Sequence, residues 1–87
     1  METLWVDLNN MGHDGMRLIC KGTLDELKEK SIQLYDGLQI LIWDNDQDEN
    51  GNADNLVVEA IVKYSNTDQC WVAQFDNAHL KNQSQRS

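Results

Sequence analysis

The sequence predicts a mainly β fold, a small five-stranded antiparallel barrel with one short α-helix. In five segments apolar residues fall at every second position, which is the period of a half-buried strand. Only residues 23–30 have helical spacing after a capping residue. These elements belong to an 87-residue chain, which has room for one domain. They must bend round one core, because a flat sheet with one small helix would leave most of one face in water.

The first two predicted strands come before the helix. Their alternating apolar positions are Leu4, Val6 and Leu8 in the first strand and Met16, Leu18 and Cys20 in the second. The stretch between them, NNMGHDG, is rich in residues that form turns. We therefore expect these two strands to pair as a hairpin.

The predicted helix over residues 23–30 begins at a capping box. Thr23 is followed three residues later by Glu26, the spacing at which the two side chains cap each other's backbone N–H groups. Two helical turns are too short to be stable alone, so the apolar face must dock on the sheet. Leu24 and Leu27 are the residues expected to do so.

Three further strands are predicted at residues 38–43, 56–64 and 70–76. An Asp-Gly turn at residues 36–37 opens the first of them, and the short connection SNTDQ makes the last two an antiparallel hairpin. The domain is expected to span residues 1–80. The remaining residues, KNQSQRS at 81–87, have the composition of a polar disordered tail.

The segments "YDGLQILIWD", "LVVEAIVKY" and "CWVAQFD" together resemble the later strands of SH3-like barrels. In particular they resemble short uncharacterised bacterial proteins of that shape, in which a turn glycine opens one strand and the last two strands form a hairpin. The resemblance covers roughly the second half of the chain. It implies an SH3-like fold and no particular function.

The charge balance excludes several classes of partner. Fifteen acidic residues against seven basic ones give a net charge of -8, whereas nucleic acids and anionic membranes require clustered Lys and Arg. No apolar segment approaches the ~20 residues of a membrane span, and no export signal precedes the first strand. Cys20 and Cys70 lie in strand-like segments outside any metal-ligand spacing. We therefore expect a reduced, cytoplasmic protein.

The acidic loop at residues 44–55 contains a calcium-loop pattern. From Asp46 it reads D-Q-D-E-N-G-N-A-D, in which alternate side chains can converge on one ion and the glycine permits a sharp turn. The candidate ligands are Asp46, Asp48, Asn50, Asn52 and Asp54. Val57 stands where an EF-hand has a bidentate Glu, and the flanking segments read as strands. The alternatives are therefore a strand-loop-strand calcium site, with Ca²⁺ as the one candidate cofactor, and a solvated turn.

Nothing else in the sequence has the pattern of a catalytic site. His13 and His79 stand far apart and outside any metal-binding or nucleophile motif. The turn at residues 12–15, GHDG, lacks the Lys and the following helix that a phosphate loop requires. We therefore expect a protein that is not an enzyme.

A surface around Trp43 is the main candidate for binding. A barrel of this size cannot readily enclose three tryptophans, and Trp43 shares a strand face with Leu41 and borders the acidic loop. With Asp44 and Glu49 it predicts a docking surface for a basic or amphipathic segment of a protein partner, or for self-association through a sheet edge. The leading prediction is a non-enzymatic protein-interaction module. A calcium-binding domain is the alternative, and a DNA-mimic inhibitor is a third, remoter class.

Overall fold

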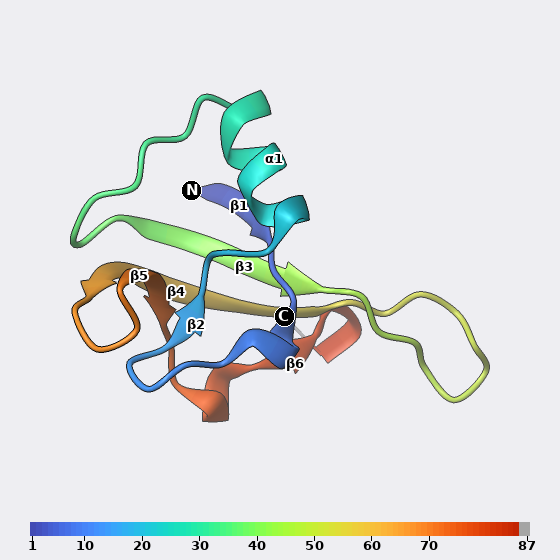
Figure 1. The fold of residues 1–87 in the computed structure, drawn as a ribbon. Coiled ribbons are helices and arrows are strands. Elements are labelled where there is room, and N and C mark those ends of the chain that lie inside the picture. The colour runs from blue at the N-terminus through green and yellow to red at the C-terminus, as the bar shows by residue number, and fades with distance from the viewer. Residues whose placement is uncertain (86–87) are drawn as a thin grey trace.

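The computed structural model describes residues 1–85. Over this range the fold is mainly β, as predicted, with a six-stranded sheet, one α-helix and three short 3-10 helices (Figure 1). In chain order the elements are β1 (Glu2–Trp5), η1 (Leu8–Asn10), β2 (Met16–Arg17), α1 (Lys21–Glu29), β3 (Gln39–Asp44), β4 (Leu56–Ser65), β5 (Cys70–Gln74), η2 (Asn77–His79), β6 (Lys81–Asn82) and η3 (Gln83–Gln85).

The strands follow the order β1-β3-β4-β5-β2, and β6 also pairs with β4. β1 is parallel to β3, with Trp5 opposite Trp43, and every other pairing is antiparallel. The predicted hairpin between the first two strands is therefore wrong, because β1 and β2 lie at opposite ends of the strand order. After β1 the chain stays beside the end of β3, where the Val6 N–H donates to the Trp43 carbonyl at 2.9 Å and the Leu8 N–H donates to the Asp44 carboxylate at 3.0 Å.

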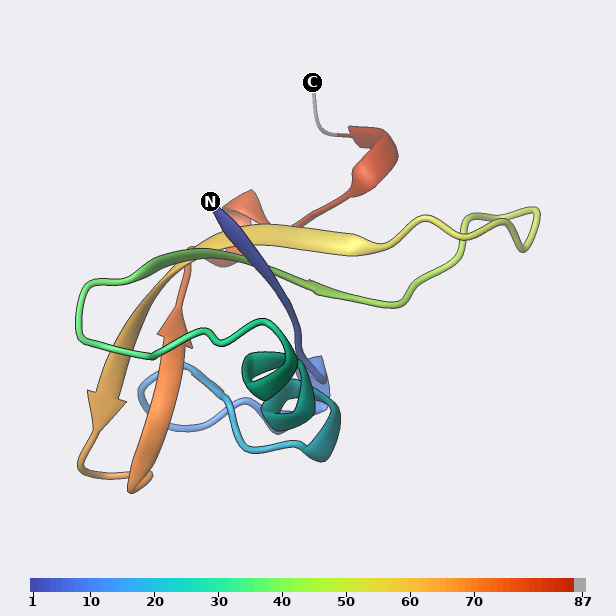
Figure 2. The same ribbon diagram turned by 90° about the horizontal axis from the view of Figure 1, so that it is seen from above.

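The sheet is bent but not closed into a barrel. No strand pairing within residues 1–85 joins β1 to β2. Figure 2 shows β4 and β5 curving away from β3, with α1 on the concave side of the bend. The buried apolar residues fill the space between the sheet and the helix: Leu4, Val6, Met16, Leu18, Leu27, Ile40, Ile42, Val58, Ala60, Val62 and Ala73. The alternating inward positions predicted for residues 38–43 and 56–64 include Ile40, Ile42, Val58, Ala60 and Val62.

The helix begins at Lys21, before the predicted capping box, so that box does not form. The hydroxyl of Thr23, inside the helix, donates to the Trp5 carbonyl at 2.7 Å, and the Glu26 carboxylate accepts from the Trp5 N–H at 2.9 Å. Lys30 donates to the Thr3 carbonyl at 2.9 Å. These side chains occupy the edge of β1 that β3 leaves open, and such cover protects a sheet edge from pairing with other chains.

The buried face of α1 also differs from the prediction. Leu27 docks in the core, but Leu24 is 49% exposed, and Thr23 takes its place one helical turn before Leu27. Trp5 packs against the first turn of the helix, where a Cβ on Gly22 would stand 2.7 Å from Cζ3 of the Trp5 ring. Gly22 therefore permits a close approach that any larger residue would obstruct.

The segment after residue 80 differs from the disordered tail expected over 81–87. Lys81 pairs with Val57 and Asn82 pairs with Leu56, so β6 extends the sheet along the edge of β4 that also carries β5. The backbone N–H of Gln83 then donates to the Asn55 carbonyl at 2.8 Å. Residues 86–87 lie outside the described residues.

The hairpin of β4 and β5 is confirmed. Its register places Tyr64 opposite Trp71, and their rings meet edge to face with centroids 5.3 Å apart.

Cys20 and Cys70 are both free thiols. In the part of the chain that the structure describes, no helix has the length and apolar character needed to cross a membrane.

Candidate functional site

Residues 45–55, here called the acidic arm, project beyond the body of the protein between β3 and β4 (Figures 1 and 2). The arm is a narrow ribbon with its own pairing. Gln47 forms a bridge with Ala53, and the Asp54 N–H donates to the Asp46 carbonyl at 2.9 Å. Backbone hydrogen bonds therefore join the two sides of the arm, and its carboxylates lie beyond the end of the sheet.

The tip of the arm is a compact turn built around Asp48. One oxygen of its carboxylate accepts hydrogen bonds from the backbone N–H groups of Asn50 and Asn52, each at 2.9 Å. Gly51 has a φ of 82°, in the left-handed region that favours glycine. Glu49 is exposed at this tip. Hydrogen bonds within the turn thus hold the Asp48 carboxylate in place, whereas Glu49 is exposed to solvent.

The base of the arm is held by the C-terminal segment. The side-chain amide of Asn82 donates to the Asp46 carboxylate at 2.7 Å and to the Asp54 carbonyl at 2.6 Å. Ser84 donates to the Asp54 carboxylate twice, from its N–H at 2.9 Å and from its hydroxyl at 2.6 Å. Hydrogen bonds from Asn82 and from the Gln47 N–H lower the pKa of Asp46 below its usual value.

These contacts bear directly on the predicted calcium ligands. Asp46 and Asp54 are bonded to the C-terminal segment and Asp48 is bonded to its own turn, so each of the three carboxylates has a partner within the protein. Among residues 1–85, no group of three or more His, Cys, Asp or Glu side chains is placed to hold one metal ion. Calcium binding, with Asn50 and Asn52 as further ligands, stays a prediction that a melting scan with Ca²⁺ and the variants Asp46→Ala and Asp48→Ala would test.

Two of the other predicted site residues, Leu41 and Trp43, lie on the sheet face opposite the buried core, here called the outer face. Leu41 and Trp43 are half-buried on it, whereas Ile40 and Ile42 between them point into the core. All three tryptophans are half-buried. Trp43 stands in register between Trp5 of β1 and Val57 of β4.

Asp44 at the end of β3 has an intramolecular role. Its two carboxylate oxygens accept from the N–H groups of Leu8, at 3.0 Å, and Asn45, at 2.7 Å. Asn45 in turn accepts from the indole N–H of Trp5 at 3.0 Å. Asp44 therefore anchors the N-terminal segment beside the arm, and the part predicted for it in partner binding stays a prediction.

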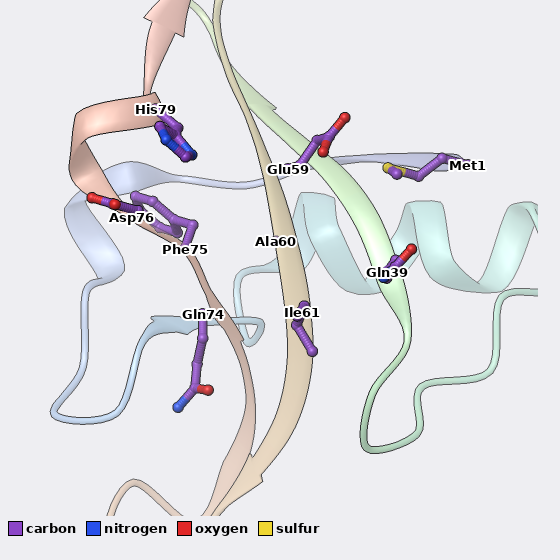
Figure 3. Close-up of a pocket in the computed structure, with 9 residues that line it drawn as sticks. All are labelled: Met1, Gln39, Glu59, Ala60, Ile61, Gln74, Phe75, Asp76 and His79. Atoms are coloured by element: carbon purple, nitrogen blue, oxygen red, sulfur yellow. The ribbon is translucent and has the colours of Figure 1, made fainter.

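A groove of about 330 Å³ opens on the outer face, next to Leu41 (Figure 3). Ile61 of β4 lies in its middle, with Phe75 and His79 on one side and Gln39 and Met1 on the other, and polar Glu59, Gln74 and Asp76 also line it. Sequence reasoning missed this groove, because its walls come from segments distant in the chain. The local signal was Ile61, an apolar residue at an outward position of the strand, which is 43% exposed.

A cluster of polar side chains connects the turn at residues 12–15 with the β4–β5 connection through hydrogen bonds. The hydroxyl of buried Ser65 hydrogen-bonds the Asp14 carboxylate and accepts from the Asp68 N–H at 2.9 Å. The Asp14 N–H donates to the Asp68 carboxylate at 3.2 Å. Because this hydroxyl is buried and bonded on both sides, its evident role is to join the two turns.

Comparison with protein-family models, with curated proteins and with solved structures finds no match for this chain. The resemblance to SH3-like barrels therefore stays a prediction. On the surface of the chain, the acidic arm and the outer face adjoin at the end of β3.

Proposed function

We propose that this protein is a non-enzymatic interaction module that binds a partner protein through the outer face and the acidic arm. The observation that carries this proposal is the position of Leu41 and Trp43, half-buried on the outer face at the point where the arm leaves the sheet. Tryptophan is enriched among the residues that dominate binding energy at protein interfaces.

The apolar character of the outer face supports docking. Leu41 and Trp43 on β3 lie beside Glu59 and Val57 on β4, and Ile61 continues the row with 43% of its surface exposed. Contiguous apolar surface rimmed by polar residues is typical of interaction sites. Val57 is already buried, so a partner would remove from water the exposed apolar area of Leu41, Trp43 and Ile61, at about 25 cal/mol per Å².

The charge pattern favours a basic partner over a second copy of the chain. No Lys or Arg occurs between Lys30 and Lys63, and the arm carries Asp46, Asp48, Glu49 and Asp54. Such a field accelerates association with a basic surface. A second copy would bring its own net charge of -8, so self-association on this side is opposed by like-charge repulsion.

Affinity capture from native lysate with two pairs of variants tests the proposal. Trp43→Ala is expected to weaken retention of a specific partner by at least about 30-fold, which is the cost of losing a 2 kcal/mol hot spot. Tyr35→Ala is the matched control, because Tyr35 is 58% exposed in the segment before β3. Glu49→Lys should also weaken retention, whereas the same charge reversal at exposed Glu29, in α1, should not.

Circular dichroism and a melting curve establish that each variant is folded before capture. Equal retention by Trp43→Ala and Tyr35→Ala would contradict the proposed surface. Capture of the protein's own copies, accompanied by a dimer in light scattering, would replace the basic partner with self-association.

A further inference from the structure

We infer that residues 81–85, here called the strap, set the direction of the acidic arm, and that release of the strap lets the arm swing as one piece about its base. The strap comprises β6 and η3 and lies beside the first residues of β4, where the arm returns to the sheet (Figure 2). Its effect on partner binding rests on the proposed function, whereas its effect on the arm does not.

The strap joins the two sides of the arm at its base. The side-chain amide of Asn82 donates to the Asp46 carboxylate, on the side that leaves β3, at 2.7 Å, and to the Asp54 carbonyl, on the side that returns to β4, at 2.6 Å. Ser84 donates to both oxygens of the Asp54 carboxylate, at 2.9 and 2.6 Å. Because β6 is itself paired with β4, the strap fixes both sides of the arm relative to the sheet.

The tip of the arm is held by its own hydrogen bonds. The Asp48 carboxylate accepts from the N–H groups of Asn50 and Asn52, and the Asp48 N–H donates to the Asn52 carbonyl at 2.9 Å. The bridge between Gln47 and Ala53 continues this pairing towards the base. Release of the strap leaves these bonds in place, so the arm keeps its shape while its direction changes.

The strap is attached to the body by polar contacts that water can replace. Its side chains are all polar, and four of the five are exposed: Lys81, Gln83, Ser84 and Gln85. Among residues 1–85, Leu80 is the last apolar residue packed against the core. Exposed hydrogen bonds contribute little net stability, and ordering the segment costs backbone entropy. We therefore expect the strap to open locally after Leu80, at a smaller cost than unfolding of the domain.

The substitution Ser84→Asp is designed to release the strap by charge. It places a carboxylate against that of Asp54, which accepts two hydrogen bonds from Ser84, and like charges at this distance repel. Asp54→Asn in the same chain should restore the contact, because an amide there can accept from the N–H of residue 84 and donate to its new carboxylate. Gln83→Ala is the matched control, since Gln83 bonds to the Asn55 carbonyl through its backbone N–H.

Nuclear magnetic resonance of the ¹⁵N-labelled protein measures the release. In the parent protein the amide order parameter of residue 84 should be that of a rigid backbone, about 0.85, and the residual dipolar couplings of the arm should fit the alignment of β4. Ser84→Asp should lower this order parameter below about 0.6. The couplings of the Asn50 and Asn52 amides should shrink by a common factor, because the tip moves as one piece. The double variant and Gln83→Ala should match the parent protein.

Partner capture tests the consequence for binding. Ser84→Asp should weaken retention of the partner about tenfold, as for an arm that keeps the binding direction about a tenth of the time. The added negative charge by itself would favour a basic partner, so weaker retention distinguishes the direction of the arm from its charge. The double variant has the net charge of the parent protein and should recover retention.

The possible results separate the strap from the proposed function. Arm couplings that stay unchanged in folded Ser84→Asp, or that shrink without recovery in the double variant, would overturn the strap. Shrunken couplings with unchanged partner retention would leave the strap in place and refute its control of binding. Failure of the parent protein to retain any partner would end the proposed function, while the couplings would still decide whether the strap directs the arm.

Discussion

Replacing Thr23 by Val should loosen the contact between α1 and the edge of β1. The Thr23 side chain is 1% exposed, and its hydroxyl donates to the Trp5 carbonyl at 2.7 Å. Valine has nearly the same shape but cannot donate a hydrogen bond. The Trp5 carbonyl, part-buried beneath the helix, then loses its donor.

The expected cost follows from that orphaned acceptor. Leaving a buried acceptor unsatisfied costs about 1–3 kcal/mol, and a domain of this size loses about 4–8 °C of Tm for each kcal/mol. Thr23→Val should therefore lower Tm by about 4–24 °C. Helix propensity contributes little to this difference, because Thr and Val rank closely.

Thermal unfolding followed by circular dichroism, with urea unfolding as a second measurement, gives the free energy of unfolding of each variant. Thr67→Val is the control, since Thr67 is exposed in the connection between β4 and β5 and its replacement should change stability by no more than about 0.5 kcal/mol. A Thr23→Val protein as stable as the Thr67→Val control would refute the claim that this hydrogen bond holds β1.

Three further outcomes are expected. Gly22→Ala should destabilise the fold by about 1–3 kcal/mol despite alanine's helix propensity, because its Cβ meets the Trp5 ring; a more stable variant in a urea titration would contradict this. Asn82→Ala should raise the pKa of Asp46 towards its usual 3.8, as followed by carboxyl NMR. A carboxyl group whose pKa is lower in the folded state stabilises the fold at pH values above its unfolded-state pKa, and this stabilisation is lost as the pH falls through the folded-state pKa. The difference in Tm between Asn82→Ala and the parent protein should therefore narrow below pH 3.8. A Tm difference that stayed the same over this range would exclude the linkage. Burial, and to a lesser extent the Asp68 carboxylate, raise the pKa of the Cys70 thiol. Iodoacetamide should therefore alkylate Cys70 more slowly in the folded protein than in urea, as measured by peptide mapping with mass spectrometry. Equal alkylation rates in the two states would show that the fold does not lower the reactivity of this thiol.

Much of the candidate site was visible in the sequence because it is contiguous. The acidic arm and the alternation that places Leu41 and Trp43 on one strand face involve neighbouring residues. The groove could not be found in the same way, since Ile61 and His79 come together only through the pairing of β4 with β5 and the turn of η2. The partners of Asp46 and Asp54 lie 36 and 30 residues further along the chain, at Asn82 and Ser84.

The capping pattern at the helix shows how tertiary contacts override a local signal. Thr23 and Glu26 have the spacing of a capping box, and either arrangement of their side chains satisfies backbone groups. Bonding to Trp5 instead fixes β1 against α1 and covers a sheet edge, so it stabilises two elements at once. The helix starts two residues before Thr23, and its N-cap residue, Cys20, makes no side-chain capping bond.

By itself the sequence determined the mainly β composition, the inward faces of β3 and β4, the β4–β5 hairpin and the acidity of the arm. Each depends on the alternation or the turn chemistry of adjacent residues, which the chain carries locally. The tertiary structure alone decided that β1 runs parallel to β3, that the sheet stays open and that residues 81–85 brace the arm. Those features depend on which distant backbone and side-chain groups find hydrogen-bond partners, and no repeat in the sequence specifies that choice.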